Sequence, residues 1–89
     1  MANGIYAKDF SEVFSKLLAM YNVTCYQISQ YTNLDQSYLK RLRTGEKNNP
    51  SPSTLFKISL ALAHLGKNVR LYDIEELFNA VGRTFIYIR

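Results

Sequence analysis

The stretch Thr24–Arg43, TCYQISQYTNLDQSYLKRLR, contains two short helical patterns separated by a polar turn. Its first residue and Gln27 have the spacing of a capping box, so a helix is expected to begin directly after position 24. Asn33 tolerates the left-handed conformation in which helices often end. Asp35 is then suited to cap a second helix that reaches about Arg43.

Two short helices joined by a turn of three to four residues have the spacing of a helix-turn-helix, whose second helix enters the major groove of DNA. Leu39 and Leu42 mark the inward side of the second helix, and its other side carries hydrogen-bond donors and cations. We expect two sets of contacts, with Gln36, Ser37 and Lys40 at base edges, and Arg41, Arg43 and Lys47 at phosphates. The alternative is a helix face that is merely solvated.

Three further residues have both a binding and a structural interpretation. Tyr26 and Gln27 begin the first helix of the pair, where a hydroxyl, an amide or free backbone N–H groups can reach phosphate. They can equally form a partly buried ring and a capping side chain. Tyr38 is suited both to the edge of the core and to donating to a phosphate. Both interpretations stay open at these positions.

The residues before this stretch predict one more helix. Asp9 and Glu12 again have capping spacing, and Asn22 is a suitable end. Between them, apolar residues recur every three or four positions, which indicates one buried helix face. They are Phe10, Val13, Phe14, Leu17, Leu18 and Tyr21.

A fourth helix is predicted after a polar loop. Gly45 ends the preceding helix, and Ser51 followed by Pro52 has the pattern that begins a new one. Gly66 is expected to close this helix. Its core face carries Leu55, Ile58, Leu62 and Leu65.

The C-terminal part combines a fifth helix with a strand. Asp73 with Glu76 is expected to cap the helix, and Gly82 to end it. Thr84–Arg89 is β-branched and aromatic, as strands are, and we expect it to pair across a dimer or with Ile5–Ala7. Region 73–89 has more apolar surface than one small chain readily hides, which makes it the expected dimerisation element. The residues concerned are Leu77, Phe78, Val81, Phe85, Ile86, Tyr87 and Ile88.

The stretch Thr24–Leu62 resembles the Cro/repressor-type helix-turn-helix domain, also called XRE-like or lambda-repressor-like. The similarity lies in Asp35–Lys40, followed by Gly45, Pro50-Ser51, Leu55, Ile58 and Ala61-Leu62. With the flanking helices, the resemblance covers most of Asp9–Val81. It implies a single all-α domain of five helices over residues 1–89, here with a short C-terminal β-strand. It also implies sequence-specific binding to double-stranded DNA, usually as a dimer on a palindromic operator.

Several positions depart from the pattern of that family. Cys25 stands where a glutamine often opens the first helix of the motif, which makes the base contacts harder to predict. Asn33 replaces the glycine of the turn. Leu18 and Arg43 occupy the places of an arginine–glutamate bridge, so we expect Arg43 to be available for the DNA backbone.

Composition restricts the remaining function classes. The 89 residues carry a net charge of +4, which suits a polyanionic partner without requiring one. The one cysteine excludes an internal disulfide and a cysteine zinc cluster. No apolar run has the length of a signal peptide or a membrane span, so we expect a cytoplasmic protein, associated with the nucleoid when bound to DNA. No phosphate loop, metal-ligand spacing or nucleophile–base set is present, so we expect no enzymatic activity, cofactor or metal.

The sequence therefore predicts a transcriptional regulator that binds double-stranded DNA as a homodimer. Two alternatives remain open. One is an antitoxin-type protein that binds both DNA and a partner protein. The other is a protein-interaction module on the same fold, which no longer binds DNA. Recovery of a stoichiometric partner protein would favour the first alternative.

Overall fold

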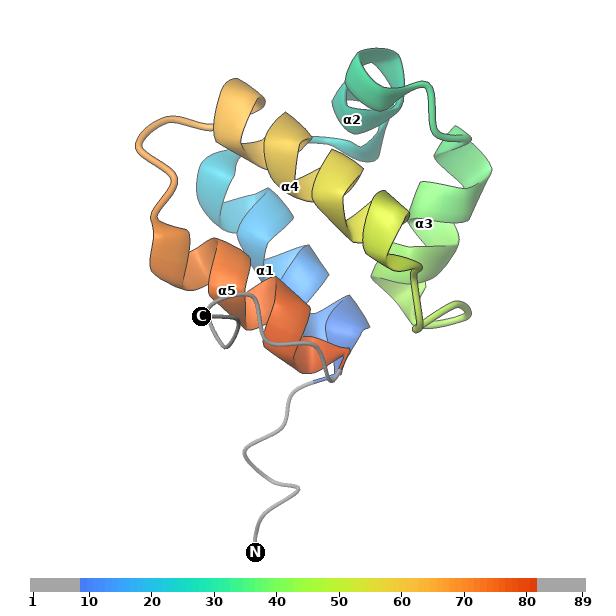
Figure 1. Ribbon diagram of the computed structural model, residues 1–89. Coiled ribbons are helices and arrows are strands. Elements are labelled where there is room, and N and C mark those ends of the chain that lie inside the picture. The colour runs from blue at the N-terminus through green and yellow to red at the C-terminus, as the bar shows by residue number, and fades with distance from the viewer. Residues whose placement is uncertain (1–8, 82–89) are drawn as a thin grey trace, which may run out of the picture.

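The structure is a computed structural model that describes residues 9–81, which form five helices and no strand (Figure 1). They are α1 (Phe10–Tyr21), α2 (Cys25–Thr32), α3 (Gln36–Thr44), α4 (Pro52–Leu65) and α5 (Leu71–Ala80). The all-α prediction is confirmed for this part of the chain. The predicted end at Gly82, the strand at Thr84–Arg89 and its candidate partner Ile5–Ala7 lie outside the described residues. Within residues 9–81, no helix is both long and apolar enough to cross a membrane.

Four helices begin at the capping residues predicted from the sequence, which are Asp9, Thr24, Asp35 and Ser51. In each case the side chain accepts a hydrogen bond from the backbone N–H three residues later. That N–H belongs to the first turn and has no partner within its own helix, so the cap stabilises the helix by about 1 kcal/mol. Asn22 and Asn33 end α1 and α2 in the left-handed conformation.

The predicted start of α5 is wrong. The helix begins at Leu71, and Arg70 occupies the N-cap position without a side-chain capping bond. Asp73 lies within the first turn, is only 1% exposed, and accepts a hydrogen bond from the Tyr21 hydroxyl of α1. The Arg70 Nε–H donates to the same carboxylate at 3.3 Å. Asp73 therefore links α5 to α1. Tyr21 and Asp73 are far apart in the sequence, so a local capping pattern could not predict this contact.

The hydrophobic core lies where α1 meets the other helices. α1 packs against α3 on one side and α5 on the other, while α2 packs against α3 and α4 (Figure 1). Large side chains from all five helices are fully buried there, namely Phe10, Phe14, Leu17, Ile28, Leu39, Leu42, Leu55, Ile58, Leu62 and Leu77. Each such side chain contributes about 1.5–3 kcal/mol through burial. The core thereby holds α3 in one orientation on the surface of the molecule.

Candidate nucleic-acid interface

The turn between α2 and α3, residues 33–35, is held by hydrogen bonds from side chains. The Ser29 hydroxyl donates to the carbonyl of Leu34 at 2.7 Å. The Asp35 carboxylate accepts from the backbone N–H of Tyr38 at 3.0 Å. These bonds satisfy backbone groups at the turn and at the first turn of α3, so they fix the direction in which α3 leaves α2.

α3 turns a polar side outward. Leu39 and Leu42 are fully buried and anchor its inward side. Neither Lys40 nor Arg43 forms an ion pair with an acidic side chain in the part of the chain that the structure describes. Among the predicted contact residues, Ser37, Lys40, Arg41, Arg43 and Lys47 are exposed, whereas Gln36 and Tyr38 are half-buried. α3 therefore presents free cations and hydroxyl or amide groups beside its anchored leucines.

The C-terminal end of α3 is fixed by a tight turn and by α1. Gly45 has a φ of +94°, a conformation that glycine adopts without steric cost. The backbone N–H groups of Gly45 and Lys47 both donate to the carbonyl of Arg41, at 3.0 and 3.1 Å. From α1, the Ser15 hydroxyl donates to the carbonyl of Arg43 at 3.1 Å. The backbone that carries Arg41, Arg43 and Lys47 is therefore ordered by bonds of its own.

Cys25 lies in the first turn of α2, close to the positive charges of α3. Its side chain is only 2% exposed. Burial raises the pKa of the Cys25 thiol, and the nearby charges of Arg43 and Lys40 offset part of this rise. The thiol therefore stays protonated at neutral pH and packs as a small apolar group.

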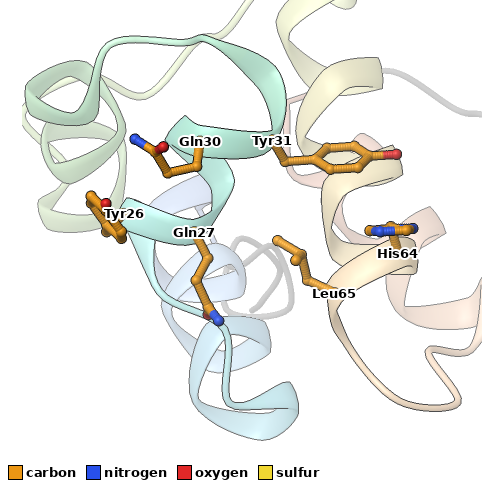
Figure 2. Close-up of a pocket in the computed structure, with 6 residues that line it drawn as sticks. All are labelled: Tyr26, Gln27, Gln30, Tyr31, His64 and Leu65. Carbon is orange, nitrogen blue, oxygen red and sulfur yellow. The ribbon is translucent and has the colours of Figure 1, made fainter.

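An open hollow lies between α2 and the end of α4 (Figure 2). Its volume is about 280 Å³, and it is lined by Tyr26, Gln27, Gln30, Tyr31, His64 and Leu65. The Tyr31 and His64 rings stack with centroids 4.8 Å apart and an interplanar angle of 23°. This pair links α2 to α4 through side chains that are both exposed.

The structure distinguishes between the binding and the structural interpretation of Tyr26 and Gln27. Gln27 Oε1 accepts from the Thr24 N–H at 2.9 Å, and the Gln27 N–H donates to the Thr24 hydroxyl at 3.1 Å. This confirms the capping role and leaves the amide Nε2 of Gln27 as its donor to a ligand. Tyr26 is 55% exposed, so its ring is not part of the core.

Gln30 is an exposed residue of α2 that the sequence reasoning did not include among the candidate DNA contacts. It lies one helical turn after Tyr26, and Figure 2 shows both side chains on the side of α2 away from His64. The i, i+4 spacing of the two residues was the available signal, because such residues share one face of a helix.

Some of the residues predicted for dimerisation are buried in the hydrophobic core. Leu77 is fully buried and Phe78 is 4% exposed, so both belong to the core. Val81 packs partly buried against that core. Leu77 and Phe78 therefore offer no surface to a second chain, which corrects their assignment to a dimer interface. The other predicted residues, Phe85, Ile86, Tyr87 and Ile88, lie outside the described part.

In residues 9–81, no group of three or more His, Cys, Asp or Glu side chains could hold a metal ion. Comparison of the chain with protein-family models, with curated proteins and with solved structures finds no match. The functional argument therefore depends on the residues of this chain alone.

Proposed function

We propose that α2 and α3 form a helix-turn-helix and that the protein is a transcriptional regulator that binds double-stranded DNA sequence-specifically. The observation that carries the proposal is the division of α3 into two sides. Leu39 and Leu42 are buried, while Lys40 and Arg43 are exposed and unpaired with acidic side chains within the described residues. Exposed cations on a helix that is held firmly from its inner side suit contacts with the base edges and phosphates of DNA.

The first turns of α3 would read the bases. The major groove of B-DNA is about 12 Å wide and admits a helix about 10–12 Å across. Gln36, Ser37 and Lys40 lie within slightly more than one turn, so they can point to neighbouring base pairs. A well-placed bidentate contact discriminates against a wrong base by about 1–3 kcal/mol.

The cations around the end of α3 would bind phosphates. Arg43 and Lys47 are exposed, and Arg41 has only a long contact of 3.9 Å to the exposed Glu46 carboxylate. Such a surface pair contributes little and is readily exchanged for a phosphate. The exposed hydroxyl of Tyr26 on α2 would add a neutral contact on the other side of the motif.

One recognition helix buries too little surface for tight specific binding, so the protein would act as a homodimer on a palindromic operator. We place this activity in the cytoplasm, on nucleoid DNA.

The experiment is selection of preferred sites from random duplex DNA, followed by binding measurements over a salt series. Lys40→Ala is expected to relax base preference at one position of the selected site, because it removes a base contact. Arg43→Ala is expected to weaken binding evenly across sequences and to reduce the salt slope by about one unit, because it removes a phosphate contact.

Lys67→Ala is the matched control, because Lys67 is also exposed but lies between α4 and α5, away from α3. This variant loses the same charge and should change neither base preference nor affinity by more than about twofold. The proposal fails if the wild-type protein binds no duplex at low salt. It also fails if Lys67→Ala weakens binding as much as Arg43→Ala does.

A further inference from the structure

The hollow between α2 and the end of α4 brings aromatic rings together with free polar groups (Figure 2). The Tyr31 and His64 rings stack on each other, yet 47% of Tyr31 is exposed. Within residues 9–81, neither the Tyr31 hydroxyl nor the His64 ring forms a hydrogen bond. Leu65, the last residue of α4, adds an apolar side chain to the lining. The hollow therefore offers ring surface, an apolar contact and hydrogen-bonding groups to one ligand.

Gln27 adds a hydrogen-bond donor that is held in place before any ligand binds. Its Oε1 accepts from the Thr24 N–H at 2.9 Å, so Nε2 is the remaining polar end of the amide. The Gln27 N–H in turn donates to the Thr24 hydroxyl at 3.1 Å. Because this capping box already orders the side chain, a ligand that accepts from Nε2 costs little conformational entropy.

The walls of the hollow are anchored on the core. Ile28 of α2 and Leu62 of α4 are fully buried. Directly after α4, the Gly66 N–H donates to the carbonyl of Leu62 at 2.8 Å. A Cβ at Gly66 would lie 2.7 Å from a neighbouring side chain, so the turn is closely packed. The hollow is therefore formed in the absence of a ligand, as binding sites for small molecules usually are.

The charge and the size of the hollow restrict what it can hold. Among the described residues that line it, there is no Asp, Glu, Lys or Arg. An ion would lose hydration there without gaining an opposite charge. The volume of about 280 Å³ is just below the range of roughly 300–1,000 Å³ for drug-sized ligands, so it suits one or two rings. A protein partner needs about 800 Å² of surface, which a hollow of this size does not supply.

We propose that this hollow binds a small uncharged aromatic compound that carries a hydrogen-bond acceptor. The ring packs against the Tyr31–His64 pair and Leu65, and the acceptor binds the amide Nε2–H of Gln27. This inference does not depend on DNA binding, and its failure would leave the proposed function untouched.

The test is an NMR titration of the full chain with nicotinamide, an uncharged ring that carries a carbonyl acceptor. We expect saturable shifts of the Tyr31 and His64 ring protons and of the Gln27 side-chain amide, with a dissociation constant of about 10 mM or lower. Nicotinate and 1-methylnicotinamide share this ring but carry a negative and a positive charge. Each should bind at least about fivefold more weakly. Shifts that do not saturate, or equal binding of either ion, would overturn the proposal.

Two variants locate the bound ring. Gln27→Glu keeps the acceptor of the capping box but replaces the Nε2 donor with an oxygen, so nicotinamide should bind at least about fivefold more weakly. Tyr31→Ala removes half of the ring pair and should weaken binding by about as much. Tyr72→Ala is the matched control, because Tyr72 is 65% exposed but lies on α5. The proposal is wrong if either site variant keeps wild-type affinity, or if Tyr72→Ala weakens binding equally.

Discussion

At Cys25, the position at a helix N-terminus and the burial of the side chain have opposite effects on the pKa of the thiol. The first turn of α2 and the charges of Arg43 and Lys40 favour the thiolate. Burial disfavours it and has the larger effect, so the pKa of the thiol is raised. A side chain that is 2% exposed is also inaccessible to reagents in solution.

We therefore expect Cys25 to react with a thiol reagent such as DTNB only when the protein unfolds. The rate should rise with urea in parallel with the unfolded fraction, because the native thiol is both protonated and covered. Since Cys25 is the one cysteine of the chain, the signal has a single source. Rapid labelling of the native protein at neutral pH would contradict this description of the site.

Tyr21 and Asp73 form the main polar contact inside the molecule. The Tyr21 hydroxyl donates to the Asp73 carboxylate and accepts from the backbone N–H of Arg70 at 3.3 Å. The carboxylate is almost completely buried, so it depends on the Tyr21 hydroxyl and on the Arg70 Nε–H as donors in place of water. Removal of one donor leaves a buried charge short of a partner, which costs more than an ordinary surface bond.

Tyr21→Phe is accordingly expected to lower the free energy of unfolding by about 1–3 kcal/mol, as measured by urea denaturation. Tyr72→Phe is the matched control, because Tyr72 is 65% exposed and its loss of a hydroxyl should cost less than about 0.5 kcal/mol. Equal decreases in the free energy of unfolding of the two variants would show that the hydrogen bond from Tyr21 to Asp73 does not stabilise the fold.

At the scale of elements, α5 is tied to α1 by an ion pair as well as by Asp73. Lys16 Nζ lies 2.8 Å from Glu76 Oε1, and the two side chains are 35% and 26% exposed. The hydrogen bond to Glu76 raises the pKa of Lys16, while burial lowers it by a smaller amount. Solvent screening at this exposure limits the contribution of the pair to about 1 kcal/mol or less.

The direction in which the pKa of Lys16 is shifted determines the pH range in which the ion pair stops stabilising the fold. A lysine whose native pKa is raised stabilises the fold fully below its unfolded pKa, about 10.4, and loses that effect as pH rises through the native value. The stability difference between the wild type and Glu76→Gln should therefore stay constant from neutral pH to about pH 10 and shrink above it. Urea unfolding across this range gives the measurement.

Glu75→Gln is the control for the alkaline experiment. Glu75 is the neighbouring residue on α5, and it forms no ion pair within the described part of the chain. Its substitution should produce a stability difference that does not change above pH 10. A parallel change in both variants would attribute the effect to the tyrosines of the chain rather than to Lys16.

At the scale of the whole molecule, charge is distributed unevenly between the helices. α3 carries Lys40, Arg41 and Arg43, whereas α5 carries Asp73, Glu75 and Glu76. α1 lies between these two helices (Figure 1). A polyanion would therefore approach the α3 side, which is the orientation that our proposal requires.

We expect the protein to be dimeric at micromolar concentration, with a mass by light scattering twice the 10.3 kDa of one chain. In a complex with a selected palindrome, the two copies of α3 should then lie about 34 Å apart, in successive major grooves. A monomeric mass that persists even with the palindrome bound would remove the dimer from the proposal.

Most local features of this fold could be predicted from the sequence. The caps at Asp9, Thr24, Asp35 and Ser51 and the left-handed ends at Asn22 and Asn33 depend on residues within four positions of one another. The inward Leu39 and Leu42 follow from helical period in the same way. The outward residues of α3 then follow as well, and they make up most of the candidate site.

The features that the sequence did not predict depend on contacts between residues far apart in the chain. Asp73 has the spacing of a cap, but Tyr21 of α1 binds its carboxylate, and α5 begins three residues earlier than predicted. From the sequence, the apolar side chains of Leu77 and Phe78 suit a core and a dimer interface equally well. The packing of the helices buries both of them in the core. Local spacing specifies backbone hydrogen bonds within a turn, whereas burial depends on which helices meet.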